Sequence, residues 1–200
     1  MGLVLGVAVA AAAALIGWWA AGFDQPVYRS LVEHRSPMLT TVMKAVSQAG
    51  SPGAMVVLAL VVTALLFRRT GQWSVALIPL VSAAVGTAAE VSLKRVVARS
   101  RPPIVNRLVP ESGRSFPSGH ATVSAALLAA VFLIAPRLVP ARFVLVVRVL
   151  AVLAVVAVGL SRLYLGVHYP LDVLAGWVIG AAIAALVVAV SRLATRARVR

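Results

Sequence analysis

The chain has 200 residues, of which 62% are hydrophobic and only 12% are charged, and its formal net charge at pH 7 is +14. Its mean hydropathy of +1.00 is far above what the core of a soluble domain requires, so the composition excludes an ordinary soluble protein and predicts a membrane protein. Cysteine is absent, which excludes disulfides, thiolate nucleophiles and cysteine-ligated metals.

Six largely uncharged stretches are long enough to cross a bilayer, because about 20 apolar residues span roughly 30 Å of hydrocarbon. Glu90 in the third stretch and Arg148 in the fifth each require a partner or water at that depth. The predicted fold class is all-α, a polytopic bundle of six transmembrane helices, with residues 1–200 forming a single membrane-embedded domain. In chain order the stretches cover about 3–22, 49–67, 73–93, 119–135, 143–160 and 171–190.

The first stretch could instead be a cleaved signal peptide, since small residues follow Trp18 and Trp19 at its end. It has no basic region before the apolar run, and that run is longer than the ~7 to 15 residues usual in a signal peptide. A first transmembrane helix is therefore the preferred interpretation.

The basic residues lie in short loops between apolar stretches, which argues against nucleic acid as their partner. With six crossings, both termini share one side with eight arginines, and the positive-inside rule makes that side cytoplasmic. The other side carries ten basic residues, six of which lie in the loop from Lys94 to Arg114. If these six bind an anion, they do not count as signals of membrane orientation. We expect a cell-membrane protein with both termini cytoplasmic and an active site on the extracytoplasmic face. The eight arginines are Arg68, Arg69, Arg137, Arg142, Arg192, Arg196, Arg198 and Arg200.

Three motifs map to this second face and together suit a phosphate. Lys94, Arg101 and Arg162 provide fixed positive charge, and forked guanidinium groups match phosphate oxygens. Ser118 and Gly119 come just before the fourth apolar stretch, where the unpaired N–H groups of a helix start favour an anion. The motifs are Lys94-x6-Arg101-Pro102, Pro117-Ser118-Gly119-His120 and Ser161-Arg162-x5-His168-x3-Asp172.

The same motifs contain a candidate nucleophile. An imidazole can act as nucleophile or general acid near neutral pH, and Asp172, four residues after His168, is placed to orient it. A zinc site of His120, His168 and Asp172 is formally possible, but the surrounding cations disfavour it. Of five carboxylates in the chain, only Glu111 and Asp172 are assigned to this face, too few for a two-metal site. No metal or cofactor is expected.

Other polar and small residues receive structural interpretations. Glu90 lies one helical turn before Lys94 and is expected to pair with it and fix its position. Gly176 and Gly180 form a Gly-x-x-x-Gly pattern that indicates close helix packing within the bundle. Four further loop arginines are interpreted as a solvated or headgroup-binding basic face and are left out of the site: Arg95, Arg99, Arg107 and Arg114.

Taken together, the three motifs resemble the type 2 phosphatidic acid phosphatase superfamily at every motif position, over residues 94–172. The resemblance implies a metal-independent mechanism in which His168 attacks phosphorus to form a phosphohistidine and Asp172 polarises the other ring nitrogen. His120 would protonate the leaving oxygen and then activate water. The residues implied to hold the phosphoryl oxygens are Lys94, Arg101, Ser118, Gly119 and Arg162.

The predicted function is an integral-membrane lipid phosphatase acting on a phosphomonoester or pyrophosphate. Within the family the implied substrates are undecaprenyl or other polyprenyl pyrophosphate, phosphatidylglycerophosphate and phosphatidic acid, which the motifs do not separate. One alternative is a lipid phosphotransferase that passes the phosphoryl group to a lipid acceptor. Another is a noncatalytic lipid or anion transporter, which would need the cations but not a nucleophile with its acid. The expected partners are the lipid substrate and the bilayer, and the sequence does not indicate an oligomeric state.

Overall fold

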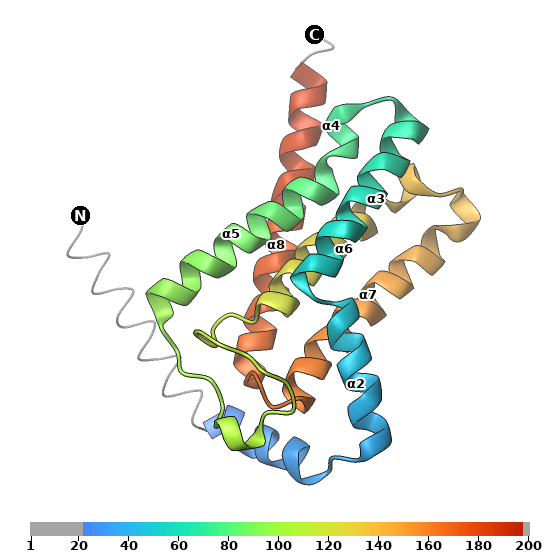
Figure 1. The fold of residues 1–200 in the computed structure, drawn as a ribbon. Helices are drawn as coiled ribbons and strands as arrows, with labels where there is room; N and C mark the ends of the chain where they lie inside the picture. The colour runs from blue at the N-terminus through green and yellow to red at the C-terminus, as the bar shows by residue number, and fades with distance from the viewer. Residues whose placement is uncertain (1–21, 198–200) are drawn as a thin grey trace, which may run out of the picture.

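The protein is all-helical throughout the part that its computed structural model describes, residues 22–197 (Figure 1). Residues 22–33 form a first helical segment. The predicted all-α class is confirmed for these residues. The elements that follow are α2 (Pro37–Ala49), α3 (Pro52–Thr70), α4 (Trp73–Ala76), α5 (Ile78–Val97), the 3₁₀ turn η1 (Ile104–Asn106), α6 (Gly119–Leu138), α7 (Ala141–Tyr164) and α8 (Pro170–Ala197).

Four of the six predicted spans correspond to helices that are long and apolar enough to cross a membrane, namely α3, α6, α7 and α8. These helices make the chain a multi-pass membrane protein. The predicted third span is divided into α4 and α5, and α5 is not among the four because it also carries Glu90, Lys94 and Arg95. The predicted first span, 3–22, lies outside the described residues except for its last position. The count of six is therefore not confirmed.

The connection between the first two predicted spans is not a simple loop, since it holds the helical residues 22–33 and helix α2. Helix α2 begins at Pro37, and the hydroxyl of Ser36 accepts a hydrogen bond from the Leu39 N–H at 3.3 Å. Proline at the first helical position and serine before it are local signals that favour a helix start. A search for long apolar runs misses these helices because polar residues interrupt them.

Helix α6 forms the centre of the bundle, with α3, α5, α7 and α8 packed around it. Small residues allow its closest contact, the one with α8. A Cβ atom at Gly180 would lie 2.5 Å from the Thr122 carbonyl oxygen, and one at Gly176 would lie 2.9 Å from the Ala121 Cβ. The predicted role of Gly176 and Gly180 in close helix packing is confirmed.

Arg148 has a partner within the bundle. Its Nε–H donates to the Phe132 carbonyl oxygen at 3.3 Å, and its guanidinium lies 5.0 Å from the centroid of the Phe132 ring. A carbonyl group and a ring face on α6 thus stabilise the charged residue that the sequence leaves unexplained in α7.

One end of the bundle collects every segment that carries a motif. The C-terminal ends of α5 and α7, the N-terminal ends of α6 and α8, and the long connection 98–118 meet there (Figure 1). The connection is tied down by backbone hydrogen bonds, from the Leu108 N–H to the Leu165 oxygen at 3.0 Å and from the Ser115 N–H to the Arg99 oxygen at 2.8 Å. The fold therefore brings motifs far apart in sequence to a single site.

Candidate active site

His168 lies in the short connection between α7 and α8, and its side chain is only 1% exposed. Its Nδ1 is 3.5 Å from Asp172 Oδ2 and 3.4 Å from the Ser115 hydroxyl. Its Nε2 is 2.9 Å from Arg101 Nη1, which is a hydrogen-bond donor in every protonation state. The Nε2 atom must then supply a lone pair, so this network assigns the imidazole proton to Nδ1.

The His168 imidazole is neutral at ordinary pH. Burial lowers the pKa of His168, and the hydrogen bond to Asp172 only partly offsets that effect, while the positive charges of Arg101 and Arg162 lower it further, to about 4. A neutral ring that keeps the Nε2 lone pair, which here accepts from Arg101, is the form that a nucleophile requires.

Asp172, in the first turn of α8, uses both carboxylate oxygens. Oδ2 accepts from the Tyr169 N–H at 2.9 Å and from the Ser115 hydroxyl at 2.5 Å, in addition to facing His168. Oδ1 accepts from Arg99 Nη1 at 2.6 Å. This pattern holds the carboxylate in one orientation beside the imidazole.

Lys94, in the last turn of α5, forms the predicted ion pair with Glu90. Glu90 also lies against the start of α6, because a Cβ at Gly119 would be 2.9 Å from Glu90 Oε1. The absence of a side chain at Gly119 lets the two helices approach at this point. The predicted Glu90–Lys94 pair is therefore confirmed, and it places the Lys94 ammonium group next to the first turn of α6.

Arg101 and Arg162 share one carboxylate partner. Arg162 Nη2 donates to Glu111 Oε1, and Arg101 Nη2 lies 3.7 Å from Glu111 Oε2. A further donor of Arg162, Nη1, binds the Ser47 hydroxyl at 2.5 Å. Two arginines around a single carboxylate form a pocket with the charge and spacing for an oxyanion.

Two buried donors on the motif residues have no hydrogen-bond partner in the described part of the chain, namely the Ser118 hydroxyl and Arg162 Nε. Ser118 is fully buried and directly precedes α6, but its side chain does not cap the helix. Buried polar groups are nearly always satisfied, so an orphan hydroxyl at a helix start and an orphan donor on Arg162 are groups that a bound anion could satisfy.

His120, the second residue of α6, completes the group of predicted residues. Its ring is within electrostatic reach of Lys94, Arg101, Arg162 and His168. The structure therefore brings the predicted catalytic and phosphate-binding residues together at one end of the bundle.

This arrangement agrees with comparisons to known proteins. The family model described as the PAP2 superfamily matches residues 73–196. The chain belongs to the PAP2 superfamily. Phosphatidylglycerophosphatase B of Bacillus subtilis is 33% identical over 159 residues, covering 78% of this chain and 77% of that protein. Decaprenylphosphoryl-5-phosphoribose phosphatase of Mycobacterium tuberculosis is 38% identical over 147 residues, covering 72% and 75% of the two chains.

Two solved structures share the fold. The crystal structure of a transmembrane PAP2-type phosphatidylglycerolphosphate phosphatase from Bacillus subtilis has a TM-score of 0.81 at 28% identity, covering 95% of this chain and 94% of that chain. Aquifex aeolicus LpxE has a TM-score of 0.66 at 23% identity, over 82% of this chain and 94% of its own. The predictions of PAP2 membership and of a membrane lipid phosphatase are confirmed.

The structure corrects two assignments in this PAP2 chain. Arg107, interpreted from sequence as part of a solvated basic face, is half-buried and donates to the carbonyl oxygens of Pro102 and Glu111. Arg99, given the same interpretation, forms ion pairs with Asp172 and Asp24. Asp24 and Glu90 also lie at the site end, so the sequence underestimates the carboxylates on this face. The sequence does contain one indication of these pairs, the small number of carboxylates. The chain has only five, and each of them needs a partner in so apolar a protein.

A metal centre has no ligand set in the described part of the chain. Across residues 22–197, no group of three His, Asp or Glu side chains is placed to hold a metal ion. The zinc site of His120, His168 and Asp172 considered from sequence is therefore not favoured.

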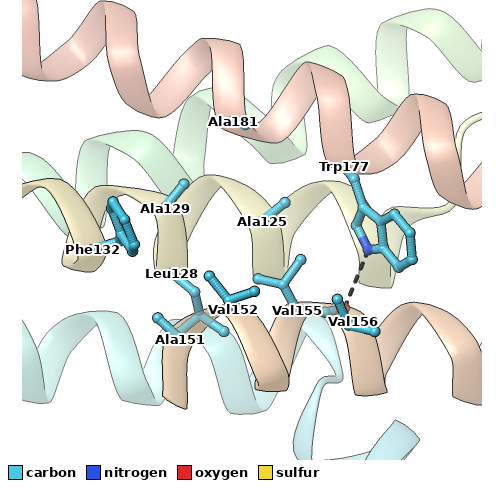
Figure 2. A pocket seen from close by; sticks show the side chains of 10 residues that line it. All are labelled: Ala125, Leu128, Ala129, Phe132, Ala151, Val152, Val155, Val156, Trp177 and Ala181. Atoms are coloured by element: carbon cyan, nitrogen blue, oxygen red, sulfur yellow. Dashed lines mark hydrogen bonds between the residues drawn. The ribbon is translucent and has the colours of Figure 1, made fainter. Parts of the chain in front are cut away.

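An apolar groove of about 350 Å³ lies between α6, α7 and α8, apart from the site (Figure 2). Trp177 closes one end, where its Nε1–H donates to the Val155 oxygen at 3.2 Å. Buried Leu163 and Val173 pack with Ala121 and Trp177 in a small cluster. The cluster shares Trp177 with the groove, and its members Ala121 and Val173 directly follow the predicted site residues His120 and Asp172 in sequence.

Proposed function

We propose that this PAP2 protein hydrolyses a lipid phosphate through a phosphohistidine on His168, with Asp172 as its orienting carboxylate and His120 as acid and base. In this proposal the whole chain works as one membrane-embedded domain, with residues 94–172 as its catalytic core. The phosphoryl oxygens bind the side chains of Lys94, Arg101, Ser118 and Arg162 and the backbone at Gly119.

The observation that supports this assignment is a neutral imidazole beside two arginines that converge on a single carboxylate, that of Glu111. His168 Nε2 faces the Arg101 guanidinium, and the Ser118 hydroxyl and Arg162 Nε lack partners within the described residues. A phosphoryl group seated on these donors would present its phosphorus to Nε2. Preorganised donors of this kind stabilise the charge that develops on the equatorial oxygens.

The chemistry then runs in two steps. In the first, the Nε2 lone pair forms a bond to phosphorus while the phosphorus–oxygen bond to the lipid breaks, and His120 gives a proton to the departing oxygen. In the second, His120 takes a proton from water, whose oxygen bonds to phosphorus as the phosphorus–nitrogen bond breaks. Inorganic phosphate leaves and His168 is regenerated. Acid–base help of this type contributes about 10² to 10⁴ in rate.

The substrate class follows from the membrane setting and from the named relatives, which act on phosphatidylglycerophosphate and on a decaprenylphosphoryl sugar phosphate. A lipid whose phosphate or pyrophosphate reaches the motif-bearing end of the bundle fits both. In the proposed orientation, six helices cross the cell membrane, both termini are cytoplasmic and this end faces outward, as the eight arginines on the other side favour.

The decisive experiment follows the phosphoryl group. Purified protein in detergent is mixed with radiolabelled lipid phosphate and quenched in alkali, in which phosphohistidine survives. We expect label on His168 and release of inorganic phosphate, and neither in His168→Gln. The variant His34→Gln is a matched control, since His34 is an exposed histidine whose Nδ1 lies 2.7 Å from the Ser30 oxygen. Near wild-type turnover in His168→Gln, or label on another residue, would overturn the proposal.

A second experiment separates acid from base. With an aryl phosphate whose leaving group needs no proton, His120→Asn should still form the phosphohistidine but release phosphate slowly. Equal losses in both steps would contradict the two-step role of His120.

Metal dependence gives an independent check. Orthovanadate, an oxyanion that resembles phosphate, should inhibit, whereas EDTA should leave phosphate release unchanged. Inhibition by EDTA that a divalent ion reverses would rule out the mechanism.

A further inference from the structure

Arg99 sits just beyond the end of α5 and joins two buried carboxylates. Its Nη1 donates to Asp172 Oδ1 at 2.6 Å, and its Nη2 donates to Asp24 Oδ2. Asp172 and Asp24 are 0% and 1% exposed. The guanidinium also lies 4.7 Å from the centroid of the Tyr169 ring. None of these contacts belongs to the proposed phosphate pocket.

This contact fixes the oxygen of Asp172 that faces away from the nucleophile. Oδ2 meets His168 Nδ1, while Oδ1 has Arg99 as its one hydrogen-bond partner within residues 22–197. The Tyr169 N–H and the Ser115 hydroxyl hold Oδ2, and Arg99 holds Oδ1. If Oδ1 lost its partner, the carboxylate would have more freedom to turn about its terminal bond, since such a torsion has broad wells. Arg99 therefore helps to determine which oxygen accepts the Nδ1 proton.

Asp24 holds Arg99 and, with its other oxygen, the start of α8. Its Oδ1 accepts from the Leu171 N–H at 2.9 Å, and this N–H is one that the first helical turn leaves without an intrahelical partner. The negative charge of Asp24 also balances the positive charge of Arg99. Arg99 therefore cancels less of the negative potential that Asp172 produces at His168.

The protonation state of Arg99 is consistent with this bridging position. Burial lowers the pKa of Arg99, but Asp172 and Asp24 more than offset this effect, so the pKa is raised above its ordinary value. The guanidinium stays charged and forked between the two carboxylates, and this is the geometry that arginine provides and lysine does not.

We propose that Arg99 and Asp24 are positioning residues for the nucleophile: Arg99 fixes Asp172 beside His168, and Asp24 fixes Arg99 and the first turn of α8. This inference rests on the proposed role of His168.

The experiment compares Arg99→Gln, Arg99→Lys and Asp24→Asn with Arg114→Gln, an exposed arginine of the same connection. Because a misplaced catalytic group costs up to about 100-fold, we expect kcat for Arg99→Gln to fall by roughly that factor. KM should stay within about threefold, since Arg99 touches no proposed phosphate ligand. Arg99→Lys and Asp24→Asn should lose about tenfold each, as partial losses of the same positioning.

The rate is expressed per active site, counted from the amplitude of phosphohistidine formation, so that misfolded protein does not enter kcat. The double variant Arg99→Gln with Asp24→Asn removes one positive and one negative charge. It therefore folds more readily than a single variant that leaves one of these buried charges without its partner. We expect it to be no slower than Arg99→Gln alone, because both residues act through Asp172.

Three results would overturn the inference. They are an unchanged kcat per site in the Arg99 variants, a raised KM at constant kcat, or additive losses in the double variant. An inactive His168→Gln beside fully active Arg99 variants would reject this inference alone. Label on a residue other than His168 would reject the proposed function itself.

Discussion

The carboxylate of Glu111 lies between the two arginines that we propose to bind phosphate. It contacts Arg162 directly and lies 3.7 Å from Arg101. A phosphoryl group has the same charge sign and the same preference for forked donors, so both anions cannot occupy these donors together. Glu111 must move aside when phosphate binds.

Removing the charge of Glu111 should therefore tighten anion binding. We expect Glu111→Gln to lower the inhibition constant for inorganic phosphate by about tenfold, equivalent to about 1.4 kcal/mol. The measurement is inhibition of lipid-phosphate hydrolysis by added phosphate, and Glu33→Gln, an exposed carboxylate elsewhere, is the control. A higher inhibition constant would mean that Glu111 supports the arginines instead of competing with their ligand.

The titration of His168 has a consequence for stability. Its pKa is lowered from 6.5 to about 4 in the folded protein, so between these values the unfolded chain binds more protons than the folded one. Stability therefore rises with pH across this window and is lost as pH falls from 6.5 towards 4. The measured quantity is the thermal midpoint of the wild type minus that of His168→Gln. We expect this difference to decrease as the pH is lowered from 6.5 towards 4 and to be constant above pH 7. A pH-independent difference would show that His168 titrates normally.

At the scale of helices, sequence predicts best where a local pattern carries the signal. Helices α3, α6, α7 and α8 follow from apolar runs, and the Glu90–Lys94 pair follows from the spacing of one helical turn. Arg99 forms ion pairs with Asp172, 73 positions later in the chain, and with Asp24, 75 positions earlier. No periodicity in the sequence encodes such contacts. That is why the motifs locate the proposed catalytic residues while the network behind Asp172 emerges only from the fold.

The contact between α6 and α8 offers a matched stability test. A Cβ at Gly180 would lie 2.5 Å from the Thr122 carbonyl oxygen, whereas one at Gly53 meets nothing within 4 Å. We expect Gly180→Ala to destabilise the protein by about 1–3 kcal/mol through overpacking. Gly53→Ala should leave stability unchanged or slightly raised, since alanine favours a helix. Thermal unfolding in detergent measures both, and equal midpoints would contradict the tight packing at Gly180.

For the whole molecule, the absence of cysteine makes the proposed orientation directly testable. Val105, 88% exposed in η1, lies at the site end, and Gln72 lies at the opposite end between α3 and α4 (Figure 1). We expect an impermeant thiol reagent to label Val105→Cys in intact cells and Gln72→Cys only after lysis. The reverse pattern would place the site in the cytoplasm.

The triad of Asp24, Arg99 and Asp172 also bears on how the bundle assembles. Arg99 lies 75 positions after Asp24 and 73 positions before Asp172, so the three side chains come from the helical residues before α2, the connection after α5 and the first turn of α8. In the proposed mechanism, Asp172 takes its place beside His168 only once the first turn of α8 has docked against the other two segments. A misassembled chain with α8 displaced would therefore keep Lys94 and Arg101 but lack an oriented nucleophile.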